Sequence, residues 1–157
     1  MLSVADNAHK NLLTTQQRWL EWLLIAAMLL LLGFFLYHQA AKTGFLTEKF
    51  GLLEAISLYG PIVLALAAPL VRFFTGDRNF ARLFEVVANL ALMFGAIRLL
   101  TVFPFDFTHL PDVLPVQMQF VFAWMTDGFG KVILLLQAVL GGVTAVATAI
   151  KYLAARG

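Results

Sequence analysis

Four long apolar stretches constrain this chain more than any other feature. Each is close to the ~20 residues that an α-helix needs to cross the ~30 Å hydrocarbon core of a bilayer. Short connectors that carry most of the charged residues separate them. The sequence therefore predicts an all-α integral membrane four-helix bundle, a single transmembrane domain over residues 1–157, with spans at about 19–37, 55–71, 86–103 and 132–150.

Composition supports a membrane protein and excludes several other classes. The chain is 61% hydrophobic and 13% charged, whereas soluble domains average about 45–50% apolar and about 25% charged residues. The absence of cysteine rules out disulfides, thiolate zinc sites and cysteine-ligated iron–sulfur clusters. The small excess of basic residues lies in short connectors beside helix ends, so it indicates membrane topology and not a nucleic-acid partner.

The distribution of Lys and Arg predicts how the chain is oriented. Basic residues are expected to concentrate on the cytoplasmic side of a membrane protein. Both termini and the middle connector hold seven of them, against three in the other two connectors. We therefore expect cytoplasmic N- and C-termini. The first apolar stretch is too long for a typical signal peptide, and for such a Leu- and Ala-rich chain a bacterial inner (cytoplasmic) membrane is the expected location.

The third connector, about residues 104–130, has two contrasting halves. Its first half contains prolines and aspartates, and its second half is rich in Phe, Met and Trp. Phe120, Phe122 and Trp124 would form an apolar surface too large to leave in water. We expect residues 116–126 to form an interfacial helix on the outer side.

Arg98 is the one basic residue inside a predicted span. It lies about five residues, or ~7.5 Å, from the end of the third span. A buried Arg costs ~2.5–3.5 kcal/mol on insertion scales, so it needs a partner. One interpretation is contact with an anionic substrate or a subunit-interface ion pair. The other is that its long side chain reaches outward to headgroups or to the aspartates of the third connector, Asp106, Asp112 and Asp127.

A second polar group lies at the cytoplasmic end of the same span. Arg82, Glu85 and Asn89 are spaced i, i+3, i+7, which places them on one helix face. We expect Glu85 to pair with Arg82 and Asn89 to hydrogen-bond to another helix. Arg98 lies about 180° around the helix from Asn89, so this helix alone does not make a continuous polar pore wall. Arg98, Glu85 and Asn89 are the candidate binding residues.

Two histidine-containing patterns raise the question of a metal or haem. Asp106, His109 and Asp112 recur every three residues, and these residue types bind divalent metals. Prolines interrupt the segment, so a solvated, turn-rich loop is the alternative. His38 and His109 are both expected near the outer face, whereas paired haem ligands usually lie inside spans. The sequence predicts no metal and no cofactor.

The last predicted span carries small residues at helical spacing. Ala138, Gly142, Ala145 and Ala149 recur at i, i+4, i+7 and i+11. Small residues let helix backbones approach closely, which is a main device of helix association in lipid. This helix-packing face fits either internal packing or docking to another subunit.

No sequence motif indicates a catalysed reaction. The chain lacks a Gly-rich phosphate loop, a Walker-type Lys, a His/Glu zinc motif and a nucleophile elbow, so we expect no enzyme. The first functional hypothesis is a non-catalytic subunit or assembly partner of a larger membrane complex. The alternative is a small homo-oligomeric transporter or channel in which Arg98 contacts an anionic substrate. A membrane redox protein or enzyme comes last. The expected partners are the bilayer and either other membrane subunits or further copies of this chain.

Overall fold

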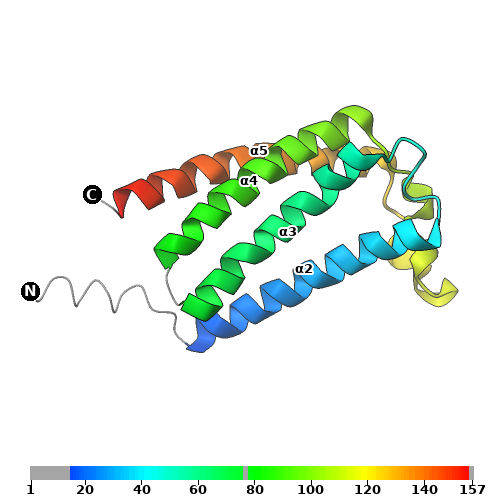
Figure 1. The fold of residues 1–157 in the computed structure, drawn as a ribbon. Coiled ribbons are helices and arrows are strands. Elements are labelled where there is room, and N and C mark those ends of the chain that lie inside the picture. The colour runs from blue at the N-terminus through cyan, green and yellow to red at the C-terminus, as the bar shows by residue number, and fades with distance from the viewer. Residues whose placement is uncertain (1–14, 76–77, 156–157) are drawn as a thin grey trace, which may run out of the picture.

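The computed structural model describes residues 15–75 and 78–155, and this part of the chain is almost entirely helical (Figure 1). The long helices are α2 (Thr15–Ala41), α3 (Leu52–Thr75), α4 (Arg78–Val102) and α5 (Asp127–Ala154), and two short 3₁₀ helices, η1 (Phe107–Val113) and η2 (Val116–Val121), precede α5. Among the described residues, four helices are long and apolar enough to cross a membrane. The predicted all-α fold with four helices of membrane-spanning length and hydropathy is confirmed.

All four long helices begin earlier than the predicted spans, α2 at Thr15. α3 begins at Leu52, α4 at Arg78 and α5 at Asp127. Hydropathy marks only the part of a helix that matches the hydrocarbon core, while backbone hydrogen bonding continues into polar residues. Local capping accounts for two starts: Glu54 accepts a hydrogen bond from the Gly51 amide at 3.1 Å, and the Thr126 hydroxyl accepts one from the Phe129 amide at 3.3 Å.

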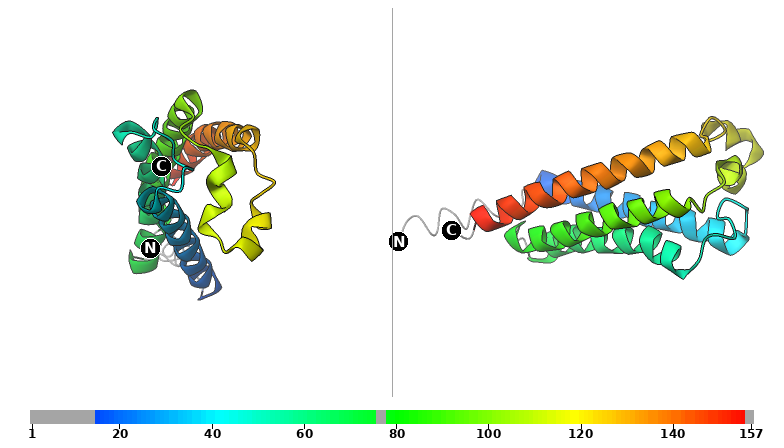
Figure 2. Two further views of the ribbon diagram at one scale, coloured as in Figure 1. Left: turned by 90° about the vertical axis from the view of Figure 1, so that its right-hand side faces the viewer. Right: turned by 90° about the horizontal axis from the view of Figure 1, so that it is seen from above.

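The four helices form a curved layer in chain order. α2 contacts α3, α3 contacts α4, and α4 contacts α5, but no described residues of α2 and α5 approach within 8 Å between Cα atoms. Seen end-on, η1 and η2 lie across the space between α2 and α5 (Figure 2). We call the end where α2 begins and α5 ends the terminal end, and the end that holds the connectors before α3 and α5 the loop end. Which of the two faces the cytoplasm stays a prediction.

Small residues set the spacing between neighbouring helices. A Cβ atom added at Gly95 of α4 would clash with the Ser57 carbonyl oxygen of α3. A Cβ atom at Gly141 of α5 would lie 2.9 Å from the Asn89 carbonyl oxygen and 3.0 Å from the Met93 amide nitrogen of α4. Backbone therefore packs on backbone at both contacts, as expected for helices associating in lipid.

The predicted helix-packing face of α5 meets α4 within the chain. Ala138 and Ala145 are buried together with Gly141. A Cβ atom at Gly142 would lie 3.0 Å from the Met93 sulfur, and Ala149 is half-buried. Gly141, the residue before Gly142 and outside the predicted set, makes the closest backbone approach to α4.

The loop end is closed by aromatic residues. Phe45 is 2% exposed, and its ring lies 5.3 Å from that of Phe105 and 5.4 Å from that of Phe107. The connectors before α3 and after α4 also meet in a single β-bridge between Leu46 and Phe105. This closure gives the array of helices one blocked end.

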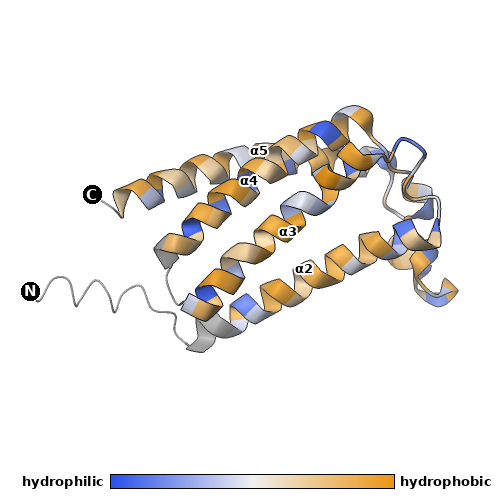
Figure 3. Cartoon of the chain, viewed as in Figure 1, coloured by the Kyte–Doolittle hydropathy of each residue, from blue (hydrophilic) through white to orange (hydrophobic). Residues whose placement is uncertain are grey.

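The predicted helix over residues 116–126 is present only in part. The chain forms the short 3₁₀ helix η2 and then a turn. Val116, Phe120 and Trp124 remain largely exposed. Apolar residues cover most of the helix surfaces, while polar residues gather near the helix ends and in the connectors (Figure 3). The interfacial position of η2 stays a prediction.

Gly95→Ala is expected to destabilise the protein. The added methyl group meets the α3 backbone, and overpacking a tight contact costs about 1–3 kcal/mol. Thermal unfolding in detergent should shift to a lower temperature. The matched control is Gly33→Ala, since nothing lies within 4 Å of a Cβ atom at Gly33. Equal unfolding temperatures for the two variants would contradict the close α3–α4 contact.

Candidate functional site

A cavity of about 660 Å³ lies among the four helices and is closed by the loop end. Its lining is almost entirely apolar and comes from all four long helices. Along α3 it extends from Ser57 to Arg72, about 22 Å at a rise of 1.5 Å per residue. Because no described residues of α2 and α5 pack on each other, no helix–helix contact closes the side of the cavity between them.

Small and cyclic side chains of the central helices leave this space unfilled. Ala65 and Ala68 of α3 and Ala88 and Ala96 of α4 line the cavity where larger residues would close it. Pro61 and Pro69 also line it. Each proline lacks an amide proton and so removes a backbone hydrogen bond from α3. The cavity is therefore built into the choice of residues on these two helices.

The terminal end of the cavity holds an ion cluster that joins three helices. Arg72 of α3 approaches Glu21 of α2 with Nε at 2.8 Å from Oε1, and its Nη2 donates to Oε2 at 3.0 Å. Its Nη1 forms an ion pair with Oε1 of Glu85 on α4. Arg72 and Glu85 line the cavity, and Glu21 is buried behind them. An intramembrane charged group of this kind is a functional-site candidate by default.

Two predicted contacts of this region are wrong. Glu85 pairs with Arg72, which is 13 residues away, and not with its helix neighbour Arg82. Arg82 donates through Nη1 to the Lys151 carbonyl at 3.3 Å and so contacts α5. Asn89 donates through Nδ2 to the Glu85 carbonyl of its own helix at 2.8 Å, not to another helix. Spacing along one helix could not reveal a pairing between helices.

Arg98 is paired at the loop end, outside the cavity lining. Its Nε and Nη2 donate to Oε1 of Glu54 on α3 at 3.0 and 2.6 Å. The Glu54 side chain is 6% exposed and that of Arg98 46%. The sequence analysis considered the connector aspartates as partners and missed Glu54, which was placed just outside the second span. The earlier start of α3 brings this carboxylate beside α4.

The connector aspartates have local partners instead. Asp127 accepts from the Phe107 amide at 2.9 Å. Asp106 accepts from the Thr108 hydroxyl at 2.5 Å and from its amide at 3.0 Å. These hydrogen bonds from Thr108 hold the pKa of Asp106 below its usual value, because they stabilise the carboxylate. The aspartates thus order the connector.

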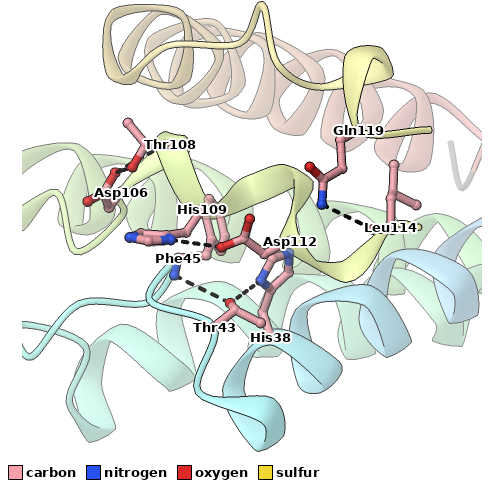
Figure 4. Close-up of polar contacts among 9 residues, drawn as sticks. All are labelled: His38, Thr43, Phe45, Asp106, Thr108, His109, Asp112, Leu114 and Gln119. Carbon is pink, nitrogen blue, oxygen red and sulfur yellow. Dashed lines mark hydrogen bonds and ion pairs between the residues drawn. The ribbon is translucent and has the colours of Figure 1, made fainter. Parts of the chain in front are cut away.

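The two histidines of the loop end, His38 and His109, have different hydrogen-bond partners (Figure 4). His109 Nδ1 lies 2.8 Å from Asp112 Oδ2. His38 Nδ1 lies 2.6 Å from the Thr43 hydroxyl. His38 is 1% exposed and packs against the rings of Phe34 and Phe45. It is therefore buried at the loop end, in the last turn of α2. Its expected position near the outer face of the membrane stays a prediction. In the described part of the chain, no group of three or more His, Cys, Asp or Glu residues is placed to hold a metal ion.

Comparison of the chain with protein-family models, curated proteins and solved structures finds no significant match.

The Glu54–Arg98 pair is expected to show energetic coupling. Removing either partner leaves the other charge without its counter-ion. The losses of unfolding free energy in Glu54→Gln and Arg98→Gln should therefore sum to more than the loss in the double variant. For residues in direct contact, the coupling in a double-mutant cycle is about 0.5–3 kcal/mol. Unfolding free energies in mixed micelles measure it. The control cycle pairs Arg98→Gln with Glu48→Gln, which should add independently, and additivity in both cycles would contradict the pair.

Proposed function

We propose that this protein is a multi-pass membrane protein that binds the hydrocarbon chain of a membrane amphiphile between α2 and α5. The observation that carries the proposal is the apolar cavity of about 660 Å³ inside the helix array. Small-molecule sites span about 300–1,000 Å³ and are mostly apolar with a few polar groups. The cavity fits both descriptions.

Its geometry suits a long, narrow ligand that arrives from the bilayer. The gap between α2 and α5 provides lateral access, and Phe105, Phe122 and Met125 close the loop end. An unfilled apolar space loses dispersion contacts on every wall, so an alkyl chain in it gains contacts that the empty cavity lacks. Binding at this site requires no catalysis, which agrees with the expectation of a non-enzyme.

An anion carrier based on Arg98 is less well supported. Arg98 already has Glu54 as its partner and does not line the cavity. An anionic substrate would have to displace that carboxylate, leaving Glu54 unpaired at considerable cost. We therefore do not favour Arg98 as a substrate contact.

The role of a non-catalytic subunit remains the second candidate. The observation that favours it is the same lateral gap, because α2 and α5 stay apart along their described lengths. A transmembrane helix of a partner would find its apolar contacts there. A bacterial cytoplasmic membrane with both termini inside is the setting that we propose for either role, on the basis of the Lys and Arg distribution.

The proposed orientation can be tested with single cysteines, since the chain has none of its own. Lys49→Cys lies at the loop end and Ala155→Cys at the terminal end. In intact cells, a membrane-impermeant maleimide should label the Lys49→Cys variant. The Ala155→Cys variant should react only after permeabilisation. The reverse pattern would mean that the loop end faces the cytoplasm.

Native mass spectrometry after gentle extraction tests ligand binding. The wild-type protein should carry one amphiphile of small mass, and Ala65→Trp should lose it because the indole would obstruct the path of an extended chain through the cavity. The matched control Val63→Trp changes an exposed residue of α3 that does not line the cavity, so it should keep the ligand. A stoichiometric polypeptide in place of the amphiphile would favour the subunit role, and loss in neither variant would overturn the proposed site.

A further inference from the structure

We propose that the amphiphile bound in the cavity carries a protonated amine, held at the terminal end by Glu85 and Asn89. This inference rests on the proposed function and adds the chemistry of the head group. It derives from the charges and free acceptor atoms that the cavity offers at its polar end.

The ion cluster has one carboxylate more than it has cations. Arg72 supplies one positive charge, whereas Glu21 and Glu85 supply two negative charges. Glu21 engages the guanidinium through both of its oxygens. Glu85 engages it through Oε1 alone. The uncompensated negative charge is therefore carried by the carboxylate that lines the cavity.

Two acceptor atoms at this end of the cavity receive no hydrogen bond from the described residues, one on this carboxylate and one on the Asn89 amide. Oε2 of Glu85 accepts no hydrogen bond from the described residues, and neither does Oδ1 of Asn89, whose Nδ2 is committed to its own helix. Both residues line the cavity one helical turn apart on α4. A carboxylate and an amide oxygen at this spacing suit a group that carries several N–H donors, and an ammonium carries three.

Other charges nearby do not reverse this preference. Arg82 and Lys151 lie toward the ends of α4 and α5, and neither lines the cavity. Gln137 of α5 does line it, but its amide is neutral. A carboxylate or phosphate head group would face the excess charge of Glu85 and would be repelled.

The opposite end of the cavity fixes the direction of the chain. Its lining at the loop end includes Phe45, Phe105, Phe122 and Met125 and contains no charged side chain. The alkyl chain would therefore point toward the loop end, with the ammonium at the terminal end. Under the proposed orientation, the head group would lie near the cytoplasmic side of the membrane.

The test is competition for the wild-type protein among three probes of equal chain length: hexadecylamine, hexadecan-1-ol and hexadecanoic acid. They are offered at equal concentration to the protein in nanodiscs, and bound masses are read by native mass spectrometry. Bound hexadecylamine should exceed bound hexadecan-1-ol about tenfold, because a hydrogen bond to a charged group strengthens binding by at least that factor. The acid should bind least.

Glu85→Gln should abolish the preference for the amine while hexadecan-1-ol still binds, which also reports an intact cavity. Glu85→Asp keeps a carboxylate and should retain the preference for the amine. This variant tests the role of the charge if Glu85→Gln does not fold. Glu48→Gln, an exposed carboxylate of the loop end, is the matched control and should behave as wild type. Equal binding of all three probes to wild type would overturn the head-group assignment alone, whereas binding of none of them would overturn the proposed function itself.

Discussion

The Arg72 guanidinium is the contact on which the arrangement of the first three helices depends. It joins α2, α3 and α4 through Glu21 and Glu85 at the terminal end. Within lipid, apolar side chains gain nothing by leaving the bilayer for a neighbouring helix, so polar contacts and close backbone packing decide which helices associate. α3, α4 and α5 use close packing at Gly95 and Gly141. α2 makes fewer contacts with the array and relies on polar ties.

Those polar ties lie at the two ends of α2. Besides the Arg72 cluster, Gln39 of α2 accepts a hydrogen bond from the Tyr59 hydroxyl of α3 at 2.7 Å. Between these ends, α2 and α3 both line the cavity. The ion cluster closes the terminal end of the cavity that the small side chains of α3 and α4 leave open. The charged cluster and the apolar cavity share residues, because Arg72 and Glu85 belong to both.

The sequence predicted what depends on composition and missed what depends on partners. Hydropathy and helix length located the four spans, because the bilayer imposes them directly. The sequence pattern could not show that Glu85 pairs with Arg72 or that Arg98 pairs with Glu54, because these pairs form between helices. Gly142 was selected by regular spacing, while the actual crossing of α4 and α5 centres on Gly141. The cavity was not predicted, because it depends on which helices fail to touch.

The chain-order array also has a consequence for how the protein is made. Among the described residues, each long helix packs only on the long helices next to it in the sequence, and α2 and α5 also contact η1. A ribosome delivers helices in that same order, so each new span meets its final neighbour as soon as it enters the bilayer. Contacts between elements close in sequence form faster than distant ones. Glu21 would find Arg72 when α3 inserts, and α4 would then supply Glu85. Only the closure of the loop end must wait for the connector before α5, which makes that step the last to join segments that are far apart in the chain.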